Sequence, residues 1–117
     1  MANIYHYSTA SGRQPVKDFI EALPWEARYQ IITVLRRLAN DEQVGMPHVG
    51  TMAGIAHGLY EIRIRDAQGL IRVFFFTKIR GAIYLVHALR KKSRVIAHND
   101  RILILKRIQE IRRRYKD

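Results

Sequence analysis

With 117 residues, the chain is long enough for one domain with one modest core and leaves no room for a separate substrate domain. It contains no cysteine, which excludes disulfides, thiolate metal sites and a cysteine nucleophile, and which fits a cytoplasmic protein. The net charge of +11 arises after residue 56, because residues 1–56 carry five basic and five acidic side chains whereas residues 57–117 carry sixteen and five.

The first half of the chain predicts a short strand, two helices and a loop. Residues 3–8 are rich in β-forming side chains and predict an edge strand. Proline then begins each of two helices, at 15–22 and 24–40, whose apolar residues recur at helical spacing. Residues 41–58 contain four glycines and are predicted to be a loop with little structure of its own.

The second half predicts three strands and one helix. Apolar and polar residues alternate from Leu59, and turns separate strands expected at 59–65, 70–78 and 82–89. A basic amphipathic helix follows from Asn99, a plausible N-cap. The chain therefore predicts a single α+β domain, 1–117, in which a small antiparallel β-sheet is flanked by two N-terminal helices and a C-terminal helix. No apolar run reaches the roughly 18 residues that a membrane span requires.

The excess of positive charge predicts an acidic partner, with nucleic acid preferred to an acidic protein or anionic lipid. An even-numbered loop between the first two core strands would place Arg72 on the same face as Arg63 and Arg65, where three guanidinium groups would converge on an anion. The alternative is that Arg63 and Arg65 form a solvent-facing row paired with Glu61 and Asp66.

Two further basic segments extend this positive region. Arg90, Lys91, Lys92 and Arg94 directly follow the third strand and are expected to form a phosphate-binding rim. The C-terminal helix has basic faces that could be solvated or could dock an acidic partner.

The histidines have no metal-ligand spacing, so neither a metal nor another cofactor is predicted. His48 and His57, in the loop, are expected to be solvated. His87 alternates with Leu85 and Leu89 and is expected to be a core histidine with a hydrogen-bond partner. His98 precedes the last helix and could transfer a proton near neutral pH.

Three segments taken together resemble a known family: Gly58-Leu-Tyr-Glu-Ile-Arg63, Gly69-Leu-Ile-Arg72-Val-Phe-Phe-Phe and Ile83-Tyr-Leu-Val-His-Ala-Leu-Arg-Lys91-Lys92-Ser. In order and spacing they are similar to the core of HigB-like toxins of the RelE/ParE superfamily. Pro15-Val-Lys-Asp-Phe-Ile resembles the N-terminal part of the same family, so the resemblance covers nearly the whole chain.

This resemblance implies a microbial-ribonuclease-like fold and cleavage of messenger RNA in the ribosomal decoding site. It also implies inhibition by a cognate antitoxin, a HigA-like helix-turn-helix protein through which any contact with operator DNA would be made. Matched by position, the implied site contains the following residues: Arg63, Arg65, Arg72, Lys91, Lys92 and, close to the catalytic tyrosine of RelE, His98.

The implied chemistry is attack by a ribose 2′-hydroxyl on the adjacent phosphate. Arg63 and Arg72 suit stabilisation of the phosphorane charge, Lys91 or Lys92 would orient the phosphate, and His98 would move a proton. Further RNA contacts are expected from Arg65, Arg90 and Arg94. No carboxylate offers itself as a base, so the reaction should be slow unless the ribosome aligns the substrate. Replacing Arg72 with alanine is expected to abolish growth arrest and leave the fold intact.

Two other functions remain open at this point. A ParE-like inhibitor of DNA gyrase belongs to the same superfamily and would cleave no RNA. A non-catalytic protein that binds RNA or the ribosome would fit the segment after Lys92, where Val95-Ile-Ala97 replaces the Lys-Thr-Pro that is frequent in the HigB-like relatives.

Overall fold

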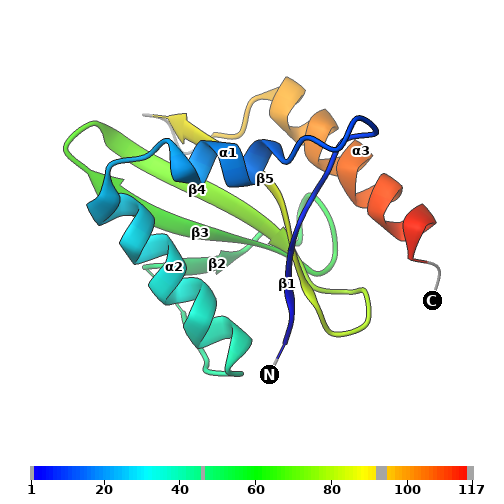
Figure 1. Ribbon diagram of the computed structural model, residues 1–117, viewed down its shortest axis with the longest axis horizontal. Coiled ribbons are helices and arrows are strands. Elements are labelled where there is room, and N and C mark those ends of the chain that lie inside the picture. Colours follow the sequence, from blue (N-terminus) through cyan, green and yellow to red (C-terminus); the bar gives the residue numbers. More distant parts are fainter. Residues whose placement is uncertain (1, 46, 92–94, 116–117) are drawn as a thin grey trace.

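The computed structural model describes residues 2–45, 47–91 and 95–115 (Figure 1). Its elements, in chain order, are β1 (Ile4–His6), α1 (Pro15–Glu21), α2 (Trp25–Ala39), β2 (Val49–Thr51), β3 (Leu59–Asp66), β4 (Gly69–Phe76), β5 (Ile83–Lys91) and α3 (His98–Arg114). None of the described helices is long and apolar enough to cross a membrane.

The five strands form one sheet in the order β1-β5-β4-β3-β2. Strands β2 to β5 pair in antiparallel fashion, as the alternation and the short turns predict. β1 is an edge strand, also as predicted, but it runs parallel to β5. The predicted α+β class and the flanking helices are therefore confirmed, and the sheet is mixed.

The prediction for residues 41–58 is wrong at one point, because Val49–Thr51 forms β2 and pairs with Tyr60–Ile62. A strand of three residues is too short to show a periodic pattern, and it exists because β3 supplies its hydrogen-bond partners. The start of the last helix also differs slightly. α3 begins at His98, with Ala97 as an N-cap that makes no side-chain hydrogen bond.

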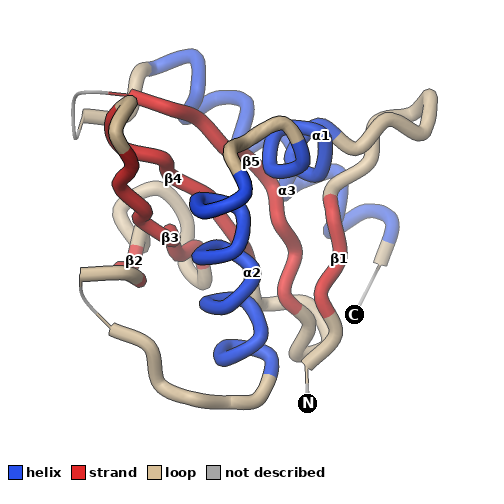
Figure 2. Tube along the Cα trace, turned by 60° about the vertical axis from the view of Figure 1, so that its left-hand side comes forward, coloured by secondary structure: helices blue, strands red, loops and turns tan. Residues whose placement is uncertain are grey.

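Helices cover both faces of the sheet (Figure 2). Alternate residues of β3 divide between the two sides. Ile62 and Ile64 pack in the core under α1 and α2, whereas Leu59 packs in the core under α3. Burial of these two apolar layers is the main favourable contribution to folding, and it orients every polar side chain on the strands.

A β-bulge interrupts the regular alternation on β5. His87 lies opposite Phe74 and Leu85 lies opposite Phe75, so Val86 is an additional residue. The expectation that Leu85, His87 and Leu89 alternate along one side is therefore wrong at Leu85. That side chain packs in the α1/α2 core, whereas Leu89 packs in the α3 core.

Candidate nucleic-acid interface

The hairpin of β3 and β4 brings the predicted arginines onto one face. Asp66 and Gly69 are paired, which leaves a loop of two residues, and Arg63 lies directly opposite Arg72. Arg65 is two residues from Arg63 on the same strand and therefore shares its face. The prediction that the three side chains face the same way is confirmed.

Glu61 lies between two of these arginines. Its Oε1 accepts a hydrogen bond from Nε of Arg63 at 2.7 Å, and its Oε2 accepts one from Nε of Arg72 at 2.6 Å. Glu61 is fully buried and Arg72 is only 2% exposed, whereas the Arg63 side chain is 28% exposed. One carboxylate thus allows two guanidinium groups to lie opposite each other on a sheet, where like charges would otherwise repel.

The alternative prediction, in which Arg63 and Arg65 face solvent and pair with Glu61 and Asp66, is correct only in part. Glu61 does pair with Arg63, but Asp66 does not pair with Arg65. Asp66 instead receives two hydrogen bonds from Arg90, at 2.6 and 2.9 Å. Those bonds lower the pKa of Asp66 and raise the pKa of Arg90.

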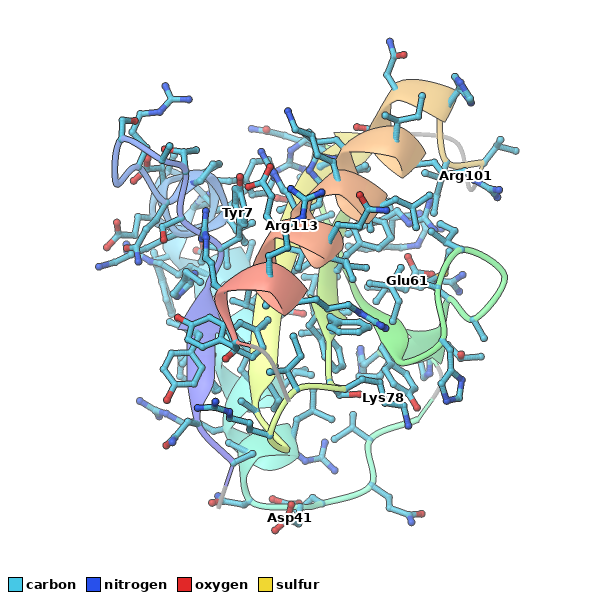
Figure 3. All side chains as sticks on the ribbon, turned by 90° about the vertical axis from the view of Figure 1, so that its right-hand side faces the viewer. Tyr7, Asp41, Glu61, Lys78, Arg101 and Arg113 are labelled. Carbon is cyan, nitrogen blue, oxygen red and sulfur yellow. The ribbon has the colours of Figure 1, made fainter. Side chains whose placement is uncertain are left out.

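The arginines line a hollow of about 450 Å³ at the tip of the hairpin. We call it the arginine hollow, and its lining residues are Gln30, Pro47, His48, Arg63, Arg65, Leu70 and Arg72. Figure 3 shows Glu61 on the face of the sheet that α3 crosses. The three guanidinium groups of the hollow differ in exposure: Arg65 is exposed, Arg63 is half-buried and Arg72 is buried.

His48 enters the arginine hollow because of β2. Val49 pairs with Ile62, and the carbonyl oxygen of His48 accepts a hydrogen bond from the backbone N–H of Arg63 at 2.7 Å. The sequence predicted only a solvated histidine in a loop, and the side chain is indeed exposed. Its place beside the arginines depends on the pairing of β2, for which the sequence gives little sign.

The predicted basic rim is brought to the arginine hollow only in part. Arg90 lies opposite Ile71, whose side chain packs in the α1/α2 core, and Arg90 is occupied by Asp66. The backbone of Lys91 pairs with Leu70, a residue of the hollow. Lys92 and Arg94 lie outside the described residues. The geometry therefore does not place Arg90 with Arg63 and Arg65.

His98 is exposed as the first residue of α3 and does not line the arginine hollow. His87, by contrast, is a core histidine with partners, as predicted. Its Nε2 lies 2.9 Å from Oδ1 of Asp100, and its Nδ1 lies 3.3 Å from an Arg107 nitrogen. Arg107 also donates to the carbonyl oxygen of Val86 at 2.8 Å, and burial lowers the pKa of its guanidinium. These contacts attach the start and middle of α3 to β5.

Among residues 2–45, 47–91 and 95–115, no three His, Asp or Glu side chains lie close enough together to hold a metal ion. What the site offers chemically is a set of fixed hydrogen-bond donors for an anion and one imidazole that can exchange a proton. Both features suit a phosphodiester.

Two comparisons with known proteins extend this description. A family model described as "Phage derived protein Gp49-like (DUF891)" matches residues 18–116. The matched segment includes every residue that lines the arginine hollow. A comparison with curated proteins found no match.

Proposed function

Because the chain belongs to the family of phage-derived Gp49-like proteins, we propose that it is a toxin that cleaves messenger RNA on the ribosome. The family is one of RelE-like toxins of type II toxin–antitoxin systems. Membership of such a toxin family implies, in general, that the chain has an antitoxin partner. The finer points, a HigB-like branch and a HigA-like helix-turn-helix antitoxin, are part of this proposal.

One observation supports cleavage above all others, namely that Arg63, Arg65, Arg72 and His48 line a single hollow. Cleavage by an internal nucleophile needs cations for the charge that develops on the phosphorane, and it needs a group that accepts the proton of the 2′-hydroxyl. The arginine hollow has both kinds of side chain. Its three arginines lie in the half of the chain that carries the whole excess of positive charge.

We assign the cationic role to Arg63 and Arg65, which are accessible. Glu61 fixes Arg63 through Nε, and this hydrogen bond leaves the two terminal nitrogens of the guanidinium group to face the phosphate. Arg72 is buried against Glu61, so it acts by fixing that carboxylate and by its positive field. Lys91 and Lys92 remain the proposed groups that orient the scissile phosphate.

His48 takes the role of proton acceptor in this scheme. Its imidazole accepts the proton of the 2′-hydroxyl while the 2′-oxygen forms a bond to phosphorus. The bond from phosphorus to the 5′-oxygen then breaks, and the leaving oxygen takes up a proton from water. The products are a 2′,3′-cyclic phosphate and a 5′-hydroxyl, and no cofactor is required.

Glu61 is unsuited to be the base. It is fully buried, and both its oxygens already accept hydrogen bonds from guanidinium groups. Binding to the ribosome would add what the isolated chain lacks, because alignment of the 2′-hydroxyl with the phosphate is a large part of such a barrier.

Primer extension on messenger RNA from cells that express the protein tests the proposal. Wild-type chain is expected to produce discrete cleavage ends within minutes of induction, and the Arg65→Ala variant is expected to produce at least about tenfold fewer. Arg36→Ala is the matched control, because Arg36 is an exposed arginine on α2 that does not line the hollow.

Two outcomes would contradict cleavage in favour of the other functions. DNA-damage signalling with intact messages would indicate a ParE-like action on gyrase. Salt-sensitive binding to ribosomes without message fragments would indicate a non-catalytic RNA-binding protein.

A further inference from the structure

A second hollow, of about 310 Å³, lies between β1 and the C-terminal end of α3. β1 pairs with Ile83–Leu85, at the start of β5, whereas Arg72 and Leu70 of the arginine hollow lie opposite Leu89 and Lys91 at the other end of that strand. The two hollows are therefore at different edges and different ends of the sheet. Figure 3 looks onto the α3 side, with Tyr7 labelled on the chain that follows β1 and Arg113 labelled on α3.

Three tyrosines form one wall of this second hollow, which we call the tyrosine hollow. The rings of Tyr5 and Tyr84 are stacked with centroids 5.2 Å apart, and Tyr115 lies tilted against Tyr84 at 5.6 Å. Tyr84 is buried, but Tyr5 is 43% exposed and Tyr115 is 38% exposed. The two outer rings thus offer accessible aromatic surface beside the hollow, and such surfaces stack unpaired bases whatever their sequence.

Two cations lie at the same place. Lys17, from α1, is exposed, and the Arg114 side chain, from the last turn of α3, is 36% exposed. Arg114 lies 3.6 Å from Oε2 of Glu110 and over the ring of Tyr7, which orients its guanidinium group. Among the residues that the structure describes, no aspartate or glutamate lines the tyrosine hollow. Within that part of the chain, Lys17 is the one of the two cations without an ion pair to a carboxylate, whereas Arg114 is shared with Glu110.

We propose that the tyrosine hollow binds one unpaired nucleotide of single-stranded RNA. The base stacks on Tyr5 or Tyr115, and Lys17 and Arg114 hold its phosphate. The volume is at the lower end of small-ligand sites, about 300–1,000 Å³. This inference goes beyond the cleavage proposed above and does not rest on it, because binding here needs none of the residues of the arginine hollow.

A binding titration with a 2′-O-methylated hexauridine tests this assignment. The methyl group removes the nucleophile, so the probe stays intact whether or not the protein is a nuclease. Tyr5→Leu is expected to weaken binding about fivefold or more, the range for losing one stacked base. Tyr29→Leu is the matched control, because Tyr29 is an exposed tyrosine on α2 that does not line the hollow, and it should bind as wild type does.

Lys17→Met is expected to reduce the slope of log affinity against log salt by about 0.7, the value for one phosphate of a single strand. Equal binding by the Tyr5→Leu and Tyr29→Leu variants, with both melting as wild type does, would overturn the proposal. If Tyr5→Leu fails to fold, photocrosslinking of the wild-type chain with a 4-thiouridine probe decides instead. Crosslinks at Tyr5 or Tyr115 support the tyrosine hollow, and crosslinks confined to other residues overturn it.

Competition identifies the ligand. The competitors are tested for displacement of a labelled 2′-O-methylated hexauridine. Uridine monophosphate should displace this probe at least about tenfold less well than unlabelled hexauridine does. Equal displacement would point to a free nucleotide, and equal displacement by inorganic phosphate would point to an anion site that ignores the tyrosines. Either result would overturn the assignment to RNA. Neither result would bear on the proposed cleavage of messenger RNA, which primer extension measures separately.

Discussion

Oε2 of Glu61 lies 2.6 Å from Nε of Arg72, and both side chains are almost completely excluded from water. Removing one partner would leave a buried charge without compensation, which costs about 3–5 kcal/mol. Glu61→Gln is therefore expected to lower the free energy of unfolding by about this amount in urea titrations.

The exposed ion pair of Arg37 and Glu42, whose side chains are 46% and 51% exposed, is the control for this prediction. Glu42→Gln should change the free energy of unfolding by less than about 1 kcal/mol. A similar small effect of Glu61→Gln would show that the buried pair contributes little. Because Arg72 is buried against Glu61, Arg72→Ala is expected to destabilise the fold, unlike the expectation from the sequence. Arg65 is exposed, so its replacement tests the site without this loss of stability.

His48 should determine the rate of cleavage. The imidazole is the one proton acceptor that the described lining of the arginine hollow offers. His48→Gln should lower the rate of message cleavage by purified protein on ribosomes about 100-fold or more, because removal of a general base typically costs this much.

His57→Gln is the control for His48, because His57 is also an exposed histidine between α2 and β3 but does not line the arginine hollow. It should leave the rate of cleavage unchanged. Cleavage by the His48→Gln variant at the rate of the His57→Gln variant would remove His48 from the reaction.

Gly58 should resist substitution. Its φ is +88°, and a Cβ atom at this position would overlap Cγ of Lys78. Gly58→Ala therefore combines backbone strain, about 1–2 kcal/mol, with displacement of the Lys78 side chain, and should lower the melting temperature by several degrees. Gly54→Ala, where a Cβ meets nothing within 4 Å and φ is not in the left-handed region, should change it little. Equal melting temperatures for the two variants would contradict the strain at Gly58.

His6 should make stability depend on pH. Because burial and then Lys17 lower its pKa from the ordinary 6.5, the unfolded chain takes up a proton at a higher pH than the folded chain does. The contribution of His6 to the free energy of unfolding is fully present above pH 6.5, and it is lost as the pH falls through the pKa of His6 in the folded chain. Urea titrations at pH 7.5 and 5.5 should show lower stability at the acid pH. His6→Gln should reduce this difference, whereas an unchanged difference would assign the effect to other groups.

Local patterns predicted most of the secondary structure. Helical spacing located α2, whose residues Ala27, Ile31, Val34 and Leu35 are all buried. Alternation located β3 and β4 and predicted that Arg63 and Arg72 share a face if the loop has an even number of residues, which the structure shows to be two. These features depend on neighbours in the chain, which is why the sequence reveals them.

Other features depend on partners distant in the chain. β2 forms only because β3 lies beside it, and so His48 could not be placed at the arginine hollow beforehand. Arg90 was expected to form a basic rim, but it pairs with Asp66, 24 positions away. The additional residue at Val86 reverses the side on which Leu85 packs, and no local pattern indicates such a bulge.

The sequence by itself determined the order of the elements other than β2 and the excess of basic side chains after residue 56. It placed the hairpin arginines on one face on the condition that their loop has an even number of residues. Only the tertiary structure decided which of those cations are neutralised or buried and which remain accessible. The physical reason is that desolvation and ion pairing depend on what packs around a charge in space, as Glu61 does around Arg63 and Arg72.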